Sequence, residues 1–124
     1  MRFERQICSP NREIAYGEDE RSLEAELDGF CFRLAENTDA LHSIADEMDI
    51  CVSAYANAAV NKACTIMTVE KGGRRLACME LRRENGIFSL VQLRAKYNGP
   101  VKETAAVMKW AKEHGIRTEG CEAA

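Results

Sequence analysis

Hydrophobic positions along the chain recur with the period of a helix in several stretches. Within residues 38–49 the apolar residues fall at i, i+3, i+4 and i+7, which predicts an amphipathic helix with Asn37 or Thr38 as its N-cap. The alanine-rich residues 51–61 predict a second, closely packed helix. Residues 22–27 follow an acidic run and have helical propensity, so a short helix that ends at the next glycine is also predicted.

A period of two and β-branched residues mark strands in the remaining stretches. The glycine pair Gly72-Gly73 and the pair Asn85-Gly86 are typical of tight hairpin turns, and each lies between two such stretches. The last three strands should therefore form an antiparallel meander. The predicted strands are a short one within residues 1–8, then Phe30–Leu34, 63–70, 75–81 and 87–95.

Both faces of the predicted meander are apolar at mid-strand, so both should be covered by helices. One cover is a last helix that begins at Pro100, buries Val101, Ala105, Met108 and Ala111 and ends near a glycine. We expect residues 120–124 to be frayed. The predicted fold class is α+β, a three- to four-stranded, mainly antiparallel β-meander packed with helices, in one domain of residues 1–124.

The composition of the chain favours a globular protein without membrane spans, disulfides or a metal site. The chain has 124 residues, of which 46% are hydrophobic and 30% charged, and it holds no apolar run of the length that a membrane span needs. The first residues lack the apolar segment of a signal peptide, which predicts a cytoplasmic protein without a membrane partner. The six cysteines are widely spaced, which favours reduced thiols over disulfides or a metal site, so no metal or cofactor is expected. Three of them have apolar neighbours and are expected in the core: Cys31, Cys64 and Cys78.

Charge is distributed unevenly along the chain. Residues 12–49 hold twelve acidic and three basic residues, whereas residues 71–102 hold eight basic and two acidic ones. A basic meander is typical of a surface that binds phosphates, although the two halves can instead neutralise one another. The basic residues predicted to form this surface are Arg74, Arg75, Arg82, Arg83, Arg94 and Lys96.

A second binding candidate follows from strand alternation after the last hairpin. The even-numbered residues Gln92, Arg94, Lys96 and Asn98 would point to one side in a row and offer cations and amides to phosphate or carboxylate, with Tyr97 pointing the other way. The alternative is that this row is the polar end of an edge strand, whose charges discourage aggregation.

Catalytic candidates are fewer. Cys51 begins a predicted helix, where a thiol gains thiolate character, and His42 lies nine residues earlier, so the two could form a nucleophilic pair. Packing of Cys51 as a small residue is the alternative. The acids Asp46, Glu47 and Asp49 are candidates for proton transfer or for a hard cation, or else form a solvated helix face.

Two stretches of the chain resemble motifs of the PcfJ-like family of proteins, which conjugative plasmids, integrative elements and phages carry. Residues 48–55 (MDICVSAY) stand in the place of an LHxCVGxY-like motif, and residues 91–100 (VQLRAKYNGP) in the place of a VxQxRGKxN-like motif. The resemblance covers about residues 30–119 and leaves residues 1–29 as a divergent N-terminal segment. Asp49 replaces the family's histidine. The motif positions retained are Cys51, Tyr55, Gln92, Arg94, Lys96 and Asn98.

The resemblance implies a small protein of a mobile element, phage or plasmid. With the charge distribution it favours a non-catalytic protein whose partner is nucleic acid or a nucleic-acid-processing protein. Two alternatives stay open: an inhibitor of a host defence nuclease that acts through the acidic half, in the manner of anti-CRISPR proteins, and a divergent enzyme that uses Cys51. The sequence does not predict an oligomeric state.

Overall fold

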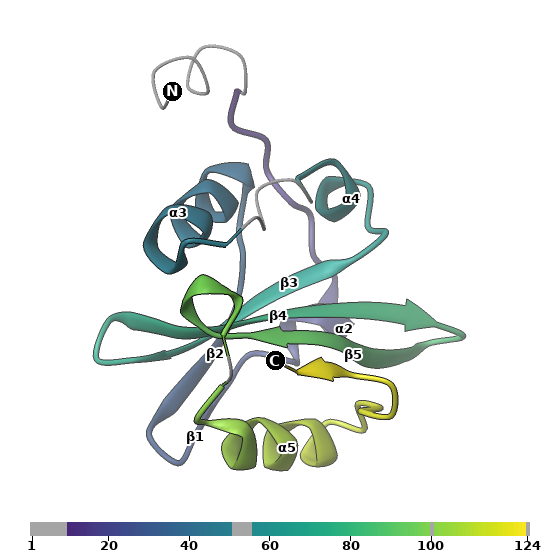
Figure 1. Ribbon diagram of the computed structural model, residues 1–124. Helices are drawn as coiled ribbons and strands as arrows, with labels where there is room; N and C mark the ends of the chain where they lie inside the picture. Colours follow the sequence, from purple (N-terminus) through teal and green to yellow (C-terminus); the bar gives the residue numbers. More distant parts are fainter. Residues whose placement is uncertain (1–9, 51–55, 100, 124) are drawn as a thin grey trace.

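The chain forms one mixed sheet with helices on both of its faces (Figure 1). The structure, a computed structural model, describes residues 10–50, 56–99 and 101–123. In these residues six strands lie side by side in the order in which they occur along the chain. They are β1 (Ala25–Leu27), β2 (Phe30–Leu34), β3 (Thr65–Lys71), β4 (Arg74–Glu84), β5 (Ile87–Arg94) and β6 (Glu122–Ala123).

Neighbouring strands from β1 to β5 are antiparallel, and β6 is parallel to β5. The predicted α+β class and antiparallel meander are therefore confirmed. The predicted number of three to four strands is too low, because the described residues form six strands. The expectation that residues 120–124 are frayed is wrong for β6, whose backbone pairs with Gln92 and Leu93 of β5.

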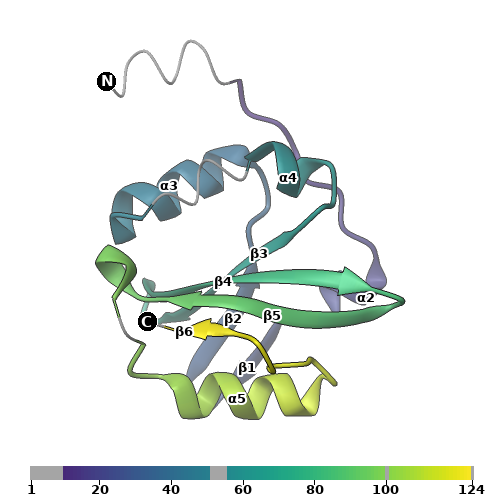
Figure 2. The ribbon, with the colours of Figure 1, turned by 45° about the vertical axis from the view of Figure 1, so that its right-hand side comes forward.

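The helices divide between the two faces, as the apolar character of both faces predicts. In Figures 1 and 2, α3 and α4 lie over one face, called here the upper face, and α5 lies under the other, the lower face. The helical segments are α2 (Glu18–Arg21), α3 (Thr38–Met48), α4 (Ala56–Val60), the 3₁₀ turn η2 (Lys96–Asn98) and α5 (Thr104–Glu113). No helix of the described ranges has the length and apolar character needed to cross a membrane.

Trp110 of α5 is at the centre of the lower core. Its ring is fully buried and stacks on Phe32 of β2, with centroids 4.9 Å apart and planes 6° from parallel. Its Nε1–H donates to the carbonyl oxygen of Leu23 at 2.8 Å. The rotation that places Trp110 against the sheet also buries Ala106 and Val107. The predicted buried face of this helix is thus wrong at Ala105, which is exposed.

The helix α3 follows its sequence prediction closely. Asn37 is the N-cap, and its Oδ1 accepts a hydrogen bond from the N–H of Ala40 at 2.8 Å. Leu41, Ile44 and Met48 are buried in the upper core. The helix ends at Met48, and its C-cap Asp49 has the left-handed conformation with φ 55°.

The predicted helix over residues 22–27 is wrong, because this stretch contains β1. Asp28 and Gly29 both have positive φ, of 54° and 84°, which suits a tight hairpin that turns β1 back onto β2. Pairing with β2 satisfies the backbone of these residues better than an isolated helical turn does. The same type of turn occurs at Gly72-Gly73 and Asn85-Gly86, where positive φ confirms both predicted hairpins.

Several other expectations concern the edges of the described ranges. The last helix begins at Thr104, not at Pro100, and Pro100 itself lies outside the described residues. The predicted helix over residues 51–61 is described only in its second half, as α4, and the predicted strand over residues 1–8 lies outside the description. The described cysteines Cys31, Cys64, Cys78 and Cys121 form no disulfide with one another. The core placement is confirmed for Cys64 and Cys78 and wrong for Cys31, which is half-buried.

Candidate polar binding face

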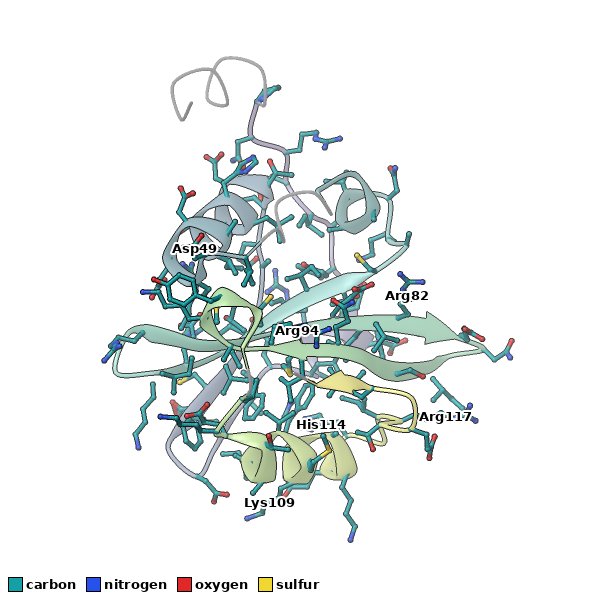
Figure 3. The ribbon with its side chains drawn as sticks, in the orientation of Figure 1. Asp49, Arg82, Arg94, Lys109, His114 and Arg117 are labelled. Atoms are coloured by element: carbon teal, nitrogen blue, oxygen red, sulfur yellow. The ribbon has the colours of Figure 1, made fainter. Side chains whose placement is uncertain are left out.

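Polar residues gather on the upper face of the β4–β5 pair. Residues that are directly opposite in neighbouring strands share a face. Arg82 is opposite Ser89, Glu80 is opposite Gln92, and Cys78, which lies in the upper core, is opposite Arg94. We call Glu80, Arg82, Ser89, Gln92 and Arg94 the polar face. In Figure 3, Arg94 lies near the middle of the strand pair and Arg82 nearer the turn that joins the strands.

A β-bulge brings these side chains to the same face. The register between β4 and β5 shifts between Glu80 and Leu81, so that Val91 of β5 has no residue opposite it. Strict alternation would place Ser89 and Gln92 on opposite faces. Because of the extra residue, Ser89, Gln92 and Arg94 all lie on the upper face, and no sequence signal marks this bulge.

Glu80 is the member of the polar face that sequence reasoning missed. Its side chain is only 6% exposed, and its Oε2 lies 3.0 Å from Nε of Arg82, whose side chain is 59% exposed. A buried carboxylate is costly unless it is paired, so Glu80 needs a cation on this face. The ion pair therefore holds the Arg82 guanidinium at the surface of the polar face.

The buried thiols beneath the polar face are poor nucleophiles. Burial, and then the negative charge of Glu80, raise the pKa of Cys78 to about 12. The same two causes raise the pKa of Cys64. Both thiols are thus protonated at neutral pH, when only a thiolate attacks readily. Cys51, the predicted catalytic candidate, lies outside the described residues, as does Tyr55.

Only the first residues of the predicted row from Gln92 to Asn98 are aligned on one side of a strand. Gln92 and Arg94 belong to β5, but the strand ends at Arg94, and Lys96 begins the 3₁₀ turn η2. The turn is closed by the N–H of Ala95, which donates to the carbonyl oxygen of Gly99 at 3.0 Å. The prediction of one straight row is therefore wrong beyond Arg94. The side chain of Asn98 lies outside the described residues.

Tyr97 at the centre of η2 has an unusual backbone and environment. Its φ is 61° and its ψ 29°, in the left-handed region that bulky residues rarely adopt. Its side chain is 68% exposed, and Nζ of Lys96 lies 5.3 Å from the centre of its ring. The turn η2 also contacts α3. The turn with Lys96 and Tyr97 thus lies beside the carboxyl end of α3, where Asp49 is located (Figures 2 and 3).

The other predicted basic residues lie elsewhere, so the six do not form one surface. Arg74 and Arg75 are at the opposite end of β4, about 24 to 27 Å from Arg82 at about 3.4 Å per residue. Nη1 of Arg75 lies 2.8 Å from Oε1 of Glu47 in α3. Arg83 is on the lower face, where it pairs with Asp19 and lies over the ring of Phe88. Much of the basic charge is therefore neutralised within the molecule.

The acids Asp46, Glu47 and Asp49 at the end of α3 are exposed. Glu47 is engaged by Arg75, and the described part of the chain has no group of three or more His, Cys, Asp or Glu side chains placed to hold a metal ion. His42 is half-buried in α3, and its Nδ1 has no hydrogen-bond partner among the residues that the structure describes.

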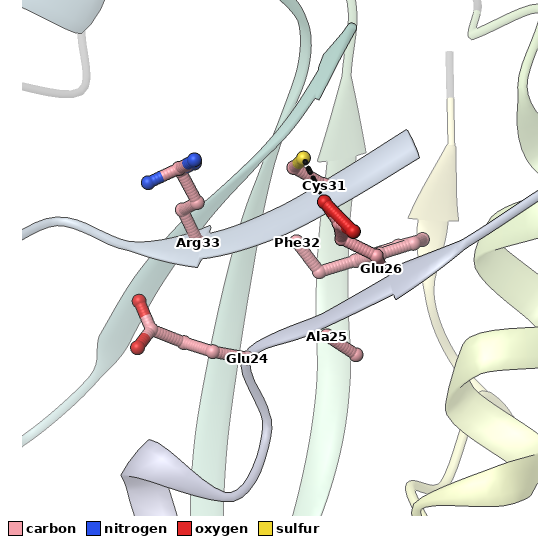
Figure 4. Close-up of a pocket in the computed structure, with 6 residues that line it drawn as sticks. All are labelled: Glu24, Ala25, Glu26, Cys31, Phe32 and Arg33. Atoms are coloured by element: carbon pink, nitrogen blue, oxygen red, sulfur yellow. Dashed lines mark hydrogen bonds between the residues drawn. The ribbon is translucent and has the colours of Figure 1, made fainter. Parts of the chain in front are cut away.

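Two cavities lie away from the polar face. One, of about 290 Å³, is at the β1–β2 hairpin, where Sγ of Cys31 lies 3.6 Å from Oε2 of Glu26 (Figure 4). The other, of about 270 Å³, lies between α3 and the strands β2 and β3 and is lined by Arg33, Glu70 and Arg75 among others. Of the predicted binding residues, only Arg75 lines either cavity.

A family model matches most of this chain. The family model described as PcfJ-like protein matches residues 2–108 of this chain. The match begins nearly at the first residue, so the expected boundary near residue 30 is too late, and it ends within α5. It includes both motif stretches and the whole polar face. No curated protein and no solved structure matches the chain.

Proposed function

The chain belongs to the PcfJ-like family, and we propose that it is a non-catalytic protein of a mobile element, phage or plasmid that binds nucleic acid through the polar face and η2. The observation that carries this proposal is the meeting of Arg82, Gln92 and Arg94 on one face, with Lys96 at its end. Three of these four residues are retained motif positions.

The chemistry of the polar face suits phosphate groups. A guanidinium binds a phosphate through parallel N–H donors, and an amide such as that of Gln92 adds a donor between the two arginines. The overall charge of -3 does not oppose this, because the acids concentrate in residues 12–49 and partly neutralise basic residues elsewhere. Contacts of this kind fix a nucleic acid backbone without reading its sequence.

A non-catalytic role is supported by the thiols and carboxylates of the described residues. The raised pKa of Cys78 and of Cys64 keeps both thiols protonated. Glu80, the buried carboxylate of the polar face, is held by Arg82. A carboxylate engaged in this way serves better to fix a guanidinium than to transfer protons.

The proposal is tested by fluorescence anisotropy with labelled DNA and RNA between about 50 and 200 mM salt, where phosphate contacts strongly weaken with salt. The double variant Arg94→Gln, Lys96→Gln should bind more weakly and lower the slope of log K against log salt by about 1.4 to 1.8. The matched control is Lys109→Gln, Lys112→Gln on α5, which removes the same charge from the far side of the sheet. Binding that is absent, independent of salt, or equally reduced in the control would contradict the proposal.

A second candidate, inhibition of a host defence nuclease, is favoured by the acids of α3. Asp39 and Asp46 are both exposed and, seven residues apart, lie on the same side of the helix, with exposed Asp49 at its end. Carboxylates in a line can occupy the basic channel of a nuclease in place of DNA. Inhibition of a purified nuclease that is lost in Asp39→Asn, Asp46→Asn, and kept in Arg94→Gln, Lys96→Gln, would support this candidate over the first.

A further inference from the structure

Tyr97 is the one exposed aromatic side chain among the residues whose burial the structure describes. Its exposed fraction is 68%, whereas the other described aromatic rings are buried or half-buried. Exposed aromatic rings that lie beside cations are the usual element of surfaces that bind unpaired bases, since every base has a face on which a ring can stack. Tyr97 has such neighbours, with Nζ of Lys96 at 5.3 Å from its ring and Arg94 at the end of the adjoining strand.

The backbone conformation of Tyr97 supports a role in binding. A bulky residue with φ of 61° is strained, and glycine would adopt this conformation at no steric cost. The ring of Tyr97 buries little surface that would offset the strain. The surrounding turn enforces the conformation through two hydrogen bonds, from Ala95 N–H to Gly99 and from Gly99 N–H to Lys96, at 3.0 and 3.1 Å. A strained turn that holds an aromatic ring in solvent presents that ring to a ligand.

The charges around η2 favour one direction in which a bound nucleic acid would run from this turn. On one side lies the carboxyl end of α3, where the helix dipole and Asp49 are both negative and repel a phosphate chain. On the other side the polar face continues from Arg94 to Arg82. Along β5, the distance from Arg94 to Ser89, which is opposite Arg82, is about 17 Å at about 3.4 Å per residue. A chain of a few nucleotides would span it, with a base on Tyr97 and phosphates along β5.

We infer that Tyr97 is a stacking platform for an unpaired base, so that the ligand of the polar face is single-stranded nucleic acid. This inference rests on the proposed function and narrows its substrate class. Bases of a duplex are already stacked within the helix and cannot cover the ring without being extruded. Single strands offer free base faces, and loss of one stacking contact of this kind weakens binding about tenfold to a hundredfold.

The test uses the full chain and a single-stranded DNA of about 12 nucleotides that contains 2-aminopurine, whose fluorescence falls on stacking, with the same sequence as a duplex for comparison. Tyr97→Phe keeps the ring and should bind as the wild type does. Tyr97→Leu keeps an apolar side chain without a π face and should bind the single strand about tenfold or more weakly, with weaker quenching of 2-aminopurine. Thermal unfolding followed by circular dichroism establishes that both variants are folded.

The outcomes separate this inference from the proposed function. If Tyr97→Leu binds single strands as the wild type does, while Arg94→Gln, Lys96→Gln binds weakly, the stacking inference is overturned and the proposed function stands. Tighter binding of the wild type to the duplex than to the single strand would also overturn the stacking inference and leave the proposed function standing. If the wild type binds neither nucleic acid, both are overturned. Selective loss of single-strand binding in Tyr97→Leu supports both.

Discussion

Replacement of Trp110 by phenylalanine should destabilise the protein by about 2 to 4 kcal/mol. The side chain is fully buried, and the smaller ring leaves a cavity of about 40 Å³, which costs about 1 kcal/mol at about 24 cal/mol per Å³. Phenylalanine also lacks the Nε1–H that donates to the carbonyl oxygen of Leu23, and a buried acceptor left without its donor costs about 1 to 3 kcal/mol. The stack on Phe32 can persist, so the two terms dominate.

Urea unfolding followed by far-ultraviolet circular dichroism measures this loss, because the variant removes the chain's one tryptophan and with it the usual fluorescence signal. The midpoint should fall with an unchanged slope. Tyr97→Phe is the matched control, since it removes an aromatic polar group at a position that is 68% exposed, and should change the free energy of unfolding by less than about 0.5 kcal/mol. A loss below about 0.5 kcal/mol in Trp110→Phe would refute the reasoning, because the hydrogen bond and packing would then contribute almost nothing.

Three further predictions concern a charge pair, a thiol and a helix cap. Hydrogen bonds from Arg21 hold the pKa of Glu36 below its ordinary value, so the stability that they contribute is present at neutral pH and lost as the pH falls through the folded-state pKa. Between about pH 5 and pH 3, urea titrations should therefore show a larger loss of stability in the wild type than in Glu36→Gln. Equal losses in the two proteins would contradict this prediction. Burial raises the pKa of Cys78 to about 12, so iodoacetamide at about pH 8 should alkylate half-buried Cys31 before Cys78, as peptide mass spectrometry can show. Equal rates at the two thiols would mean that Cys78 is reached in the native state. Asn37→Ala should cost about 1 kcal/mol in thermal or urea unfolding through loss of the α3 N-cap, whereas Asn37→Asp keeps an acceptor and should cost less.

Local signals in the sequence predicted the central part of the fold. The cap at Asn37, the spacing of apolar residues in α3 and the turns at Gly72-Gly73 and Asn85-Gly86 act through neighbouring residues, so the sequence contains what is needed to place them. The apolar character of both faces of the meander likewise predicted helices on each side. These features correspond to α3, β3, β4 and β5 of the structure.

Features that depend on distant residues were not predictable in the same way. Residues 22–27 contain good helix formers, yet the turn at Asp28-Gly29 and the partner strand β2 make part of this stretch a strand. Two short terminal pieces, β1 and β6, become strands only because an edge is available to pair with. The rotation of α5 is set by the fit of Trp110 against Phe32, which periodicity places only approximately.

The sequence predicted several residues of the candidate site but not how their side chains are arranged. Gln92, Arg94 and Lys96 were recognised as chemically suited to anions, but the bulge at Val91 and the end of β5 at Arg94 decide which of them share a face. Nothing in the sequence predicts the burial of Glu80, because a single acidic residue in a strand is normally exposed. It is buried here by the register of β3, β4 and β5. Separation of Arg74 and Arg75 from Arg82 follows from the length of β4.

The order of strands in the sheet has a consequence for how the chain folds. Each strand from β2 to β5 lies beside the strand that precedes it in the chain, and three of these four pairings are closed by tight turns. Contacts between residues close in sequence cost little loop entropy, which is typical of domains that fold rapidly. During synthesis β4 can pair with β3 before β5 emerges, and α5 is needed only to cover a sheet that has already formed. Early pairing of this kind shortens the time for which apolar strands are exposed to other chains in the cell.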